Sequence, residues 1–232
     1  LCTNPTGRIC LCCEDTLNSD FSGRRDYHIS SGLDEFRNSE YLNWVRERMM
    51  NGQDLRECLV CYEEEKRNLQ SKRLFEIQQW GELHGEQEII YADLKLGNRC
   101  NLQCLMCDPI SSSKMAAEFK ELGWDKNPPF AVGQMGIPVK DAYCQDWKWP
   151  EDENLWKTIT GLTYSLKKVK FTGGEPLLNP FVINYLEILG KLNKPDLKIQ
   201  LTTNGTVVNS RILSLLSNLN IDVIVSLEGV GP

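Results

Sequence analysis

The sequence predicts an α/β fold in which strands and helices alternate from about residue 88 onward. Four short runs have strand character, and the segments between them space their apolar residues as helices do. The expected strands are 89–94, 168–172, 197–203 and 221–227, and the expected helices are 111–122, 154–166, 181–192 and 211–219. Alternating strands and helices form βα units, and βα units assemble into a parallel sheet.

The composition is that of a globular protein and excludes several classes. The chain has 232 residues, of which 41% are hydrophobic, an ordinary share for a globular domain. It contains no apolar run long enough for a transmembrane helix, and no basic-then-apolar signal peptide begins it. The net charge of −6 argues against a nucleic-acid partner, because such domains usually carry a basic excess. We therefore expect a cytoplasmic protein without membrane contacts.

The cysteines are the strongest chemical signal in the chain. There are ten, and most are separated by short gaps. Close clusters of cysteines suit metal sites, whereas disulfide frameworks are typical of small secreted domains. The cysteines are numbers 2, 10, 12, 13, 58, 61, 100, 104, 107 and 144.

The central cluster has the spacing C-x3-C-x2-C, formed by Cys100, Cys104 and Cys107. It directly follows the first predicted strand, and α/β barrels build their active sites at the carboxyl ends of strands. Three thiolates can bind three irons of a four-iron cluster and leave the fourth iron open to a ligand. The alternatives are a zinc site or a chance grouping of cysteines.

Chemically suggestive residues follow the next three strands as well. Gly173-Gly174-Glu175-Pro176 ends the second strand; its glycines allow close backbone approach, and its carboxylate can accept hydrogen bonds from an ammonium group. Asn204 ends the third strand, and Ser226 and Glu228 end the fourth. Each motif alone indicates only a turn, so the argument depends on their order along successive strand ends.

Taken together, these motifs resemble the radical S-adenosylmethionine (SAM) superfamily. The resemblance implies a partial (β/α)6 barrel over residues 86–232, with about four βα units present and the rest beyond its C-terminal end. It implies a catalytic [4Fe–4S] cluster on Cys100, Cys104 and Cys107. Met106 stands where the family usually has an aromatic residue near the adenine. SAM-binding residues by the same resemblance are Met106, Gly173, Gly174, Glu175, Pro176, Asn204, Ser226 and Glu228.

The resemblance also implies a reaction. One electron from the cluster would cleave SAM to methionine and a 5′-deoxyadenosyl radical, which abstracts hydrogen from a substrate that the sequence leaves open between a peptide and a small molecule. A flavodoxin or ferredoxin would supply the electron. The rival interpretations are a non-catalytic iron–sulfur or zinc protein with an electron-transfer or structural role, and a metal-stabilised nucleic-acid module.

The N-terminal cysteines form a second expected site. Gly7-x4-Cys12 and Cys58-x2-Cys61 resemble the SPASM/twitch modules that bind auxiliary iron–sulfur clusters, which implies such a module in residues 1–85. The expected ligands are Cys12, Cys58, Cys61 and Cys13, with Cys10 or Cys2 as substitutes. A further cysteine of the pattern would precede residue 1, so we expect the chain to be a fragment at its N-terminal end. Because further βα units are expected beyond residue 232, we expect the same of its C-terminal end. The alternatives are a ribbon-like zinc site and unligated cysteines.

The remaining candidates have plainer interpretations. Cys144 is expected to be a small buried side chain, and His28 and His84 are expected to be surface residues. The N-terminal part is expected to add helices at 34–51 and 62–80.

Overall fold

The computed structural model describes residues 1–15, 19–24, 26–81, 88–126 and 147–227. Its centre is a sheet with the strand order β2-β1-β3-β4-β5-β6. The antiparallel pair β1 and β2 lies at one edge, and all the other neighbouring strands run parallel. The strands are β1 (Cys2–Thr3), β2 (Ile9–Cys10), β3 (Tyr91–Lys95), β4 (Lys168–Thr172), β5 (Lys198–Thr203) and β6 (Ile221–Val225).

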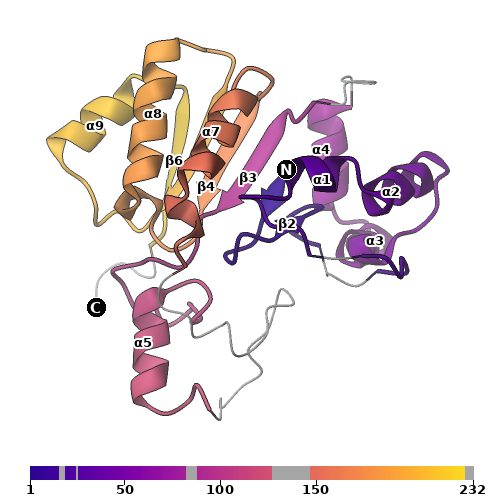
Figure 1. Cartoon of the computed structure of the whole chain (residues 1–232), viewed down its shortest axis with the longest axis horizontal. Helices are drawn as coiled ribbons and strands as arrows, with labels where there is room; N and C mark the ends of the chain where they lie inside the picture. Colours follow the sequence, from indigo (N-terminus) through magenta and orange to yellow (C-terminus); the bar gives the residue numbers. More distant parts are fainter. Residues whose placement is uncertain (16–18, 25, 82–87, 127–146, 228–232) are drawn as a thin grey trace.

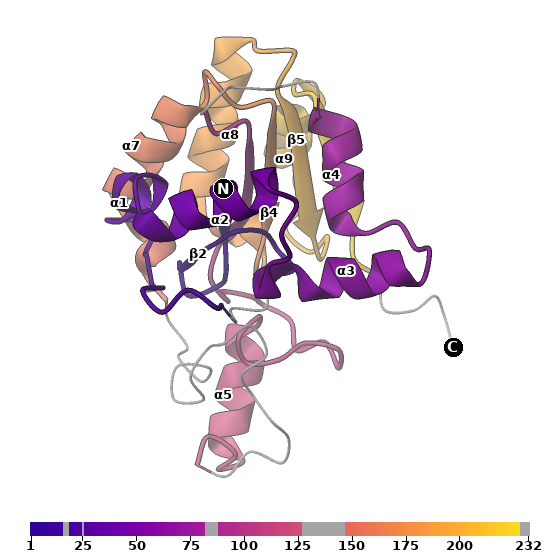
Figure 2. The same ribbon diagram turned by 90° about the vertical axis from the view of Figure 1, so that its right-hand side faces the viewer.

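Helices lie on both faces of this sheet (Figures 1 and 2). The C-terminal helices are α5 (Ser113–Glu121), α7 (Glu153–Leu162), α8 (Pro180–Leu192) and α9 (Ser210–Ser217). The N-terminal helices are α1 (Leu33–Arg37), α2 (Glu40–Met50), α3 (Leu59–Lys66) and α4 (Lys72–Trp80), and short 3-10 turns lie at η1 (Arg56–Cys58), η3 (Trp149–Glu151) and η4 (Pro176–Leu178). Figure 2 shows α7 and α4 on opposite sides of the strands.

The core lies between the strands and the α7–α8 layer. Alternate residues of β4, Val169 and Phe171, are fully buried, and the ring of Phe171 packs edge-on against Tyr185 of α8. The intervening β4 residues face the other way, where Lys170 forms an ion pair with Asp93 of β3. The period of two thus gives the sheet one apolar face and one polar face.

The four expected strands after residue 88 are all present, each within two residues of its expected start and end. The α/β class is therefore confirmed, and the parallel β3–β6 sheet is consistent with a partial barrel. The helix expected at 34–51 is interrupted, because Ser39 accepts a hydrogen bond from the Leu42 amide and caps a new helix, α2. The helix expected at 62–80 is likewise broken, by Asn68 with a φ of 58° and by the Ser71 cap of α4.

The N-terminal segment and the barrel segment share one sheet. Cys2 on β1 pairs with Asp93 on β3, the Leu1 carbonyl accepts from the Asp93 amide at 2.8 Å, and the Thr3 hydroxyl oxygen accepts from the Lys95 amide at 3.1 Å. The division into 1–85 and 86–232 remains a prediction, but the two parts are joined by backbone pairing.

A core substitution tests the α8 packing. Leu186 is fully buried, whereas Ile188 on the same helix is 36% exposed. Leu186→Ala is expected to lower the free energy of unfolding by about 2–5 kcal/mol, because it leaves a cavity in the core. Ile188→Ala is expected to cost roughly 1 kcal/mol. Denaturant unfolding of the metal-free chain followed by circular dichroism measures both, and equal losses would contradict this packing.

Candidate active site at the strand ends and a second cysteine site

The loop that carries Cys100, Cys104 and Cys107 runs from the end of β3 to the start of α5. The first residues of α5 hold its beginning in place. The Ser113 hydroxyl accepts from the Cys100 amide at 3.1 Å and donates to the Cys100 carbonyl at 3.2 Å, and the Ser112 hydroxyl donates to the Leu102 carbonyl at 2.7 Å. The three thiols are partly exposed, and the side chain of Met106 is 83% exposed. The loop therefore offers its sulfurs on an accessible surface.

The turn after β4 lies against this loop, backbone to backbone. The Gly174 amide donates to the Gly97 carbonyl at 3.1 Å, and the Glu175 amide donates to the Arg99 carbonyl at 2.7 Å. A Cβ atom at Gly174 would lie 2.2 Å from the Arg99 carbonyl oxygen. At Gly173 the φ is +117° and a Cβ would lie 2.7 Å from the Leu96 amide nitrogen. Both positions thus require glycine.

Glu175 joins the end of β4 to the end of β5. Its side chain is buried, and its carboxylate accepts hydrogen bonds from the Thr203 hydroxyl at 2.9 Å, the Asn204 amide at 2.7 Å and the Leu177 amide at 3.0 Å. The expected contact with the SAM ammonium remains a prediction. The bonds in the structure show that this carboxylate also fixes the relative position of two strand ends.

Asn204 extends the same arrangement to the cysteine loop. Its side-chain amide donates to the Asn101 side-chain oxygen at 3.0 Å and lies 3.7 Å from the Cys100 sulfur. Asn101 in turn donates to the Thr206 hydroxyl at 2.8 Å. Sequence reasoning missed Asn101 and Thr203 as contributors, because each is an ordinary polar residue whose partner lies far away in the chain.

Two further expected residues, Pro176 and Ser226, lie beside this group. Pro176 begins η4 and is buried. Ser226 follows β6, and its amide donates to the Thr203 carbonyl at 2.9 Å. Glu228 lies outside the described residues, as do His84 and Cys144. His28 is partly buried, with Nε2 3.1 Å from the Thr6 carbonyl and its ring edge-on to Trp149.

The donor set and the glycine turn fit an open-iron cluster that also binds a cofactor. Within the described ranges, no three His, Cys, Asp or Glu side chains are placed to hold a single metal ion. A cubane makes a different demand, since each thiolate binds a different iron and the sulfurs surround the cluster. The glycine turn removes side chains where a ligand must approach the backbone.

A second cysteine site lies in the N-terminal part. A cavity of about 450 Å³ is lined by cysteines from four segments, together with Asp93 and apolar residues of α2 and α4. The cysteines are Cys2 on β1, Cys12 and Cys13 after β2, Cys58 in η1 and Cys61 in α3. All are free thiols. The four expected ligands and Cys2 therefore line one cavity, although no three of these described side chains converge on a single metal position. Cys10 lines a smaller neighbouring cavity, which it shares with Cys2, Cys12 and Cys13.

Burial shapes the chemistry of these thiols. It raises the pKa of Cys12 to about 12 and that of Cys10 to about 11, and it also raises the pKa of Cys2. Burial therefore disfavours the thiolate form of these side chains. Metal binding requires the thiolate and displaces the proton, so uptake of a metal here would be coupled to proton release.

Comparison with known proteins decides the family. Residues 94–232 match the model of the radical SAM superfamily.

The chain belongs to the radical SAM superfamily.

Membership of this superfamily implies a [4Fe–4S] cluster and SAM. An uncharacterized protein of Methanocaldococcus jannaschii is 28% identical over 59% of this chain and 38% of its own length. GTP 3′,8-cyclase of Petrotoga mobilis is 28% identical over 63% of this chain and 36% of its own. Molybdenum cofactor biosynthesis protein 1 of Dictyostelium discoideum is 26% identical over 58% of this chain and 18% of its own length.

These matches span less than two fifths of each of those relatives. No solved structure gives a significant match. Among the described residues, no helix is both long and apolar enough to cross a membrane.

The glycine turn provides a direct test of the strand-end site. Gly174→Ala places a Cβ against the Arg99 carbonyl and should displace the cysteine loop. Retention of the SAM-responsive cluster is expected to fall about 10-fold, as for other supports around metal ligands. Gly161→Ala in α7 is the control, because a Cβ there meets nothing within 4 Å. EPR amplitude of the reduced, SAM-responsive cluster measures both, and equal amplitudes in the two variants would contradict the role of this turn.

Proposed function

We propose that the chain catalyses reductive cleavage of SAM at a [4Fe–4S] cluster held by Cys100, Cys104 and Cys107. The observation that carries the proposal is the convergence of three strand ends. The loop after β3, the glycine turn after β4 and Asn204 after β5 are joined by hydrogen bonds. Active sites of α/β barrels lie at this end of the strands.

The chemistry of the bound group is one-electron cleavage of SAM. A cluster held by Cys100, Cys104 and Cys107 would supply one electron for cleavage of SAM into methionine and a 5′-deoxyadenosyl radical, which would be able to take a hydrogen atom from a substrate. A flavodoxin or ferredoxin supplies the electron. In this proposal the Gly173–Gly174 backbone and Glu175 receive the amino end of SAM, Met106 lies at the adenine, and Ser226 and Glu228 contribute from the end of β6.

The substrate in this proposal is a peptide or a small molecule.

SAM cleavage is tested on the anaerobically reconstituted, dithionite-reduced protein. With SAM we expect 5′-deoxyadenosine by mass spectrometry and a shift of one cluster signal in EPR, because SAM binds the open iron. The variant with Cys100, Cys104 and Cys107 all changed to Ala should lose both. A wild-type protein with a reduced cluster that neither responds to SAM nor cleaves it would contradict the assignment of the site.

We further propose that the N-terminal cysteines hold an auxiliary iron–sulfur cluster. The proposal is supported by the gathering of five cysteines around one cavity and by the donor chemistry, since thiolates are the usual iron–sulfur ligands. Cys12, Cys58 and Cys61 are the assigned ligands, with Cys13 or Cys2 as the fourth.

The iron and sulfide content of the auxiliary site is measured in the variant with Cys100, Cys104 and Cys107 all changed to Ala, called here the triple-alanine background, because this variant lacks the other cluster. Cys12→Ala, Cys58→Ala and Cys61→Ala should each remove most of the remaining iron, because each variant lacks one of the assigned ligands. Comparison of Cys2→Ala with Cys13→Ala identifies the fourth ligand. Cys10→Ala tests the remaining substitute ligand, and we expect it to remove less iron, since Cys10 does not line the main cavity. Zinc without iron or sulfide would contradict an iron–sulfur cluster.

A further inference from the structure

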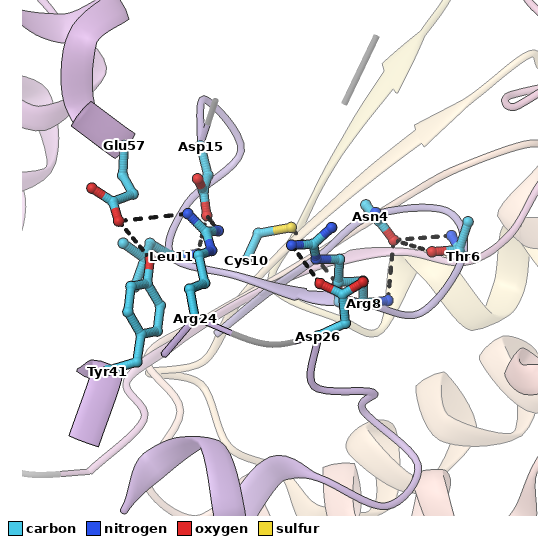
Figure 3. A network of polar contacts seen from close by, with 10 residues as sticks. All are labelled: Asn4, Thr6, Arg8, Cys10, Leu11, Asp15, Arg24, Asp26, Tyr41 and Glu57. Atoms are coloured by element: carbon cyan, nitrogen blue, oxygen red, sulfur yellow. Dashed lines mark hydrogen bonds and ion pairs between the residues drawn. The ribbon is translucent and has the colours of Figure 1, made fainter. Parts of the chain in front are cut away.

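A buried network of charges lies beside the N-terminal cysteine cavity (Figure 3). The Arg24 guanidinium lies between two carboxylates, with Nη2 2.8 Å from Asp15 Oδ2 and Nη1 3.5 Å from Glu57 Oε1. The side chains of Arg24, Asp15 and Glu57 are only 9%, 1% and 0% exposed. Figure 3 shows the three side chains pointing toward one another from separate segments of the chain.

The Asp15 side of this network holds the loop of Cys12 and Cys13. The Asp15 carboxylate accepts a hydrogen bond from the Leu11 amide at 3.1 Å, and the Asp15 amide donates to the Cys12 carbonyl at 3.3 Å. The loop is therefore closed on both sides of the two cysteines by one residue. A change in the position of the Asp15 side chain would therefore move the loop of Cys12 and Cys13.

The Glu57 side holds the second pair of cysteines. Glu57 immediately precedes Cys58 in η1, and Cys61 follows in the first turn of α3. The Tyr41 hydroxyl of α2 donates to Glu57 Oε1 at 2.9 Å, and the Arg24 guanidinium lies 5.0 Å from the centre of the Tyr41 ring. Arg24 thus connects the two cysteine-bearing segments, which lie more than forty residues apart in the sequence.

The chemistry of the network also favours a role beyond packing. Burial removes the hydration of charged side chains, which costs free energy. A protein in which a buried ion pair is replaced by apolar residues of similar volume is therefore often as stable as the original. The planar guanidinium is always charged, so Arg24 can donate a hydrogen bond to Asp15 from one nitrogen while another nitrogen attracts Glu57 at 3.5 Å. Lysine has a single nitrogen and cannot face both partners in this way.

We propose that Arg24 is a positioning residue of the auxiliary site. It holds the Cys12 loop and Cys58 at the separation that one cluster requires. This inference rests on the proposed auxiliary cluster, and it concerns residues that do not bind the metal themselves.

The variants Arg24→Gln and Arg24→Lys test the proposal in the whole polypeptide. Arg24→Gln should lower the affinity of the auxiliary site for iron about 10–100-fold in competition with a chelator. This is the usual effect of losing a residue that positions metal ligands. Arg24→Lys should give an intermediate loss, because lysine keeps the charge and lacks the planar fork. Iron and sulfide retained in the triple-alanine background measure the auxiliary site alone.

Two controls separate positioning from folding. Arg8→Gln removes a more exposed ion pair with Asp26 in the same part of the chain, where the side chains are 18% and 69% exposed, and such pairs contribute little. It should retain iron as the wild type does. With Cys100, Cys104 and Cys107 intact, Arg24→Gln should keep the SAM-induced EPR shift, which reports that the barrel segment is still folded.

Wild-type iron retention in Arg24→Gln would overturn the proposal. So would joint loss of both cluster signals in Arg24→Gln and Arg24→Lys, since the residue would then only keep the chain folded. If the triple-alanine protein with Arg24 intact holds no iron, the auxiliary cluster itself is refuted, and the role of Arg24 falls with it.

Discussion

The contact between the glycine turn and the cysteine loop is the constraint on which the strand-end site depends. Two backbone hydrogen bonds join Gly174 and Glu175 to the loop that leads into Cys100. The distance is too short for any side chain on the glycines. The Glu175 carboxylate then binds the Thr203 hydroxyl and the Asn204 amide, so a single short segment sets the relative position of three strand ends.

The strand β3 connects the two cysteine sites. Its carboxyl end leads into the loop of Cys100, while Tyr91 and Asp93 on its polar face line the cavity with the N-terminal cysteines. Asp93 also pairs with Cys2 across the sheet and with Lys170 by an ion pair at 3.2 Å. The two sites therefore share a rigid strand, and rigid elements hold functional groups more accurately than loops do.

The N-terminal part combines apolar packing with a buried network of charges. Its Ile9, Tyr27 and Phe36 belong to the same hydrophobic core as the sheet. Between β4 and α8 the contacts are apolar, with Phe171 and Tyr185 both buried. Near the N-terminal cysteines, a buried arginine lies between two carboxylates. Apolar packing tolerates volume-conserving exchange, whereas a charged network fails when one member is removed.

The local sequence determined the elements whose signals lie within a few residues of each other. Runs of strand residues marked β3 to β6, and the spacing of Cys100, Cys104 and Cys107 marked the cluster loop. Helix ends were predicted less well, because a cap such as Ser39 interrupts an apolar pattern that otherwise continues.

Only the tertiary structure decided which distant residues meet. Cys2 joins the N-terminal cavity because β1 pairs with β3, some ninety residues later in the chain. Arg24 reaches Asp15 and Glu57, and Glu175 reaches Thr203, without any spacing that the sequence could reveal. Such contacts are made when separate segments pack against one another, so their physical origin lies in the fold and leaves no periodic trace in the chain.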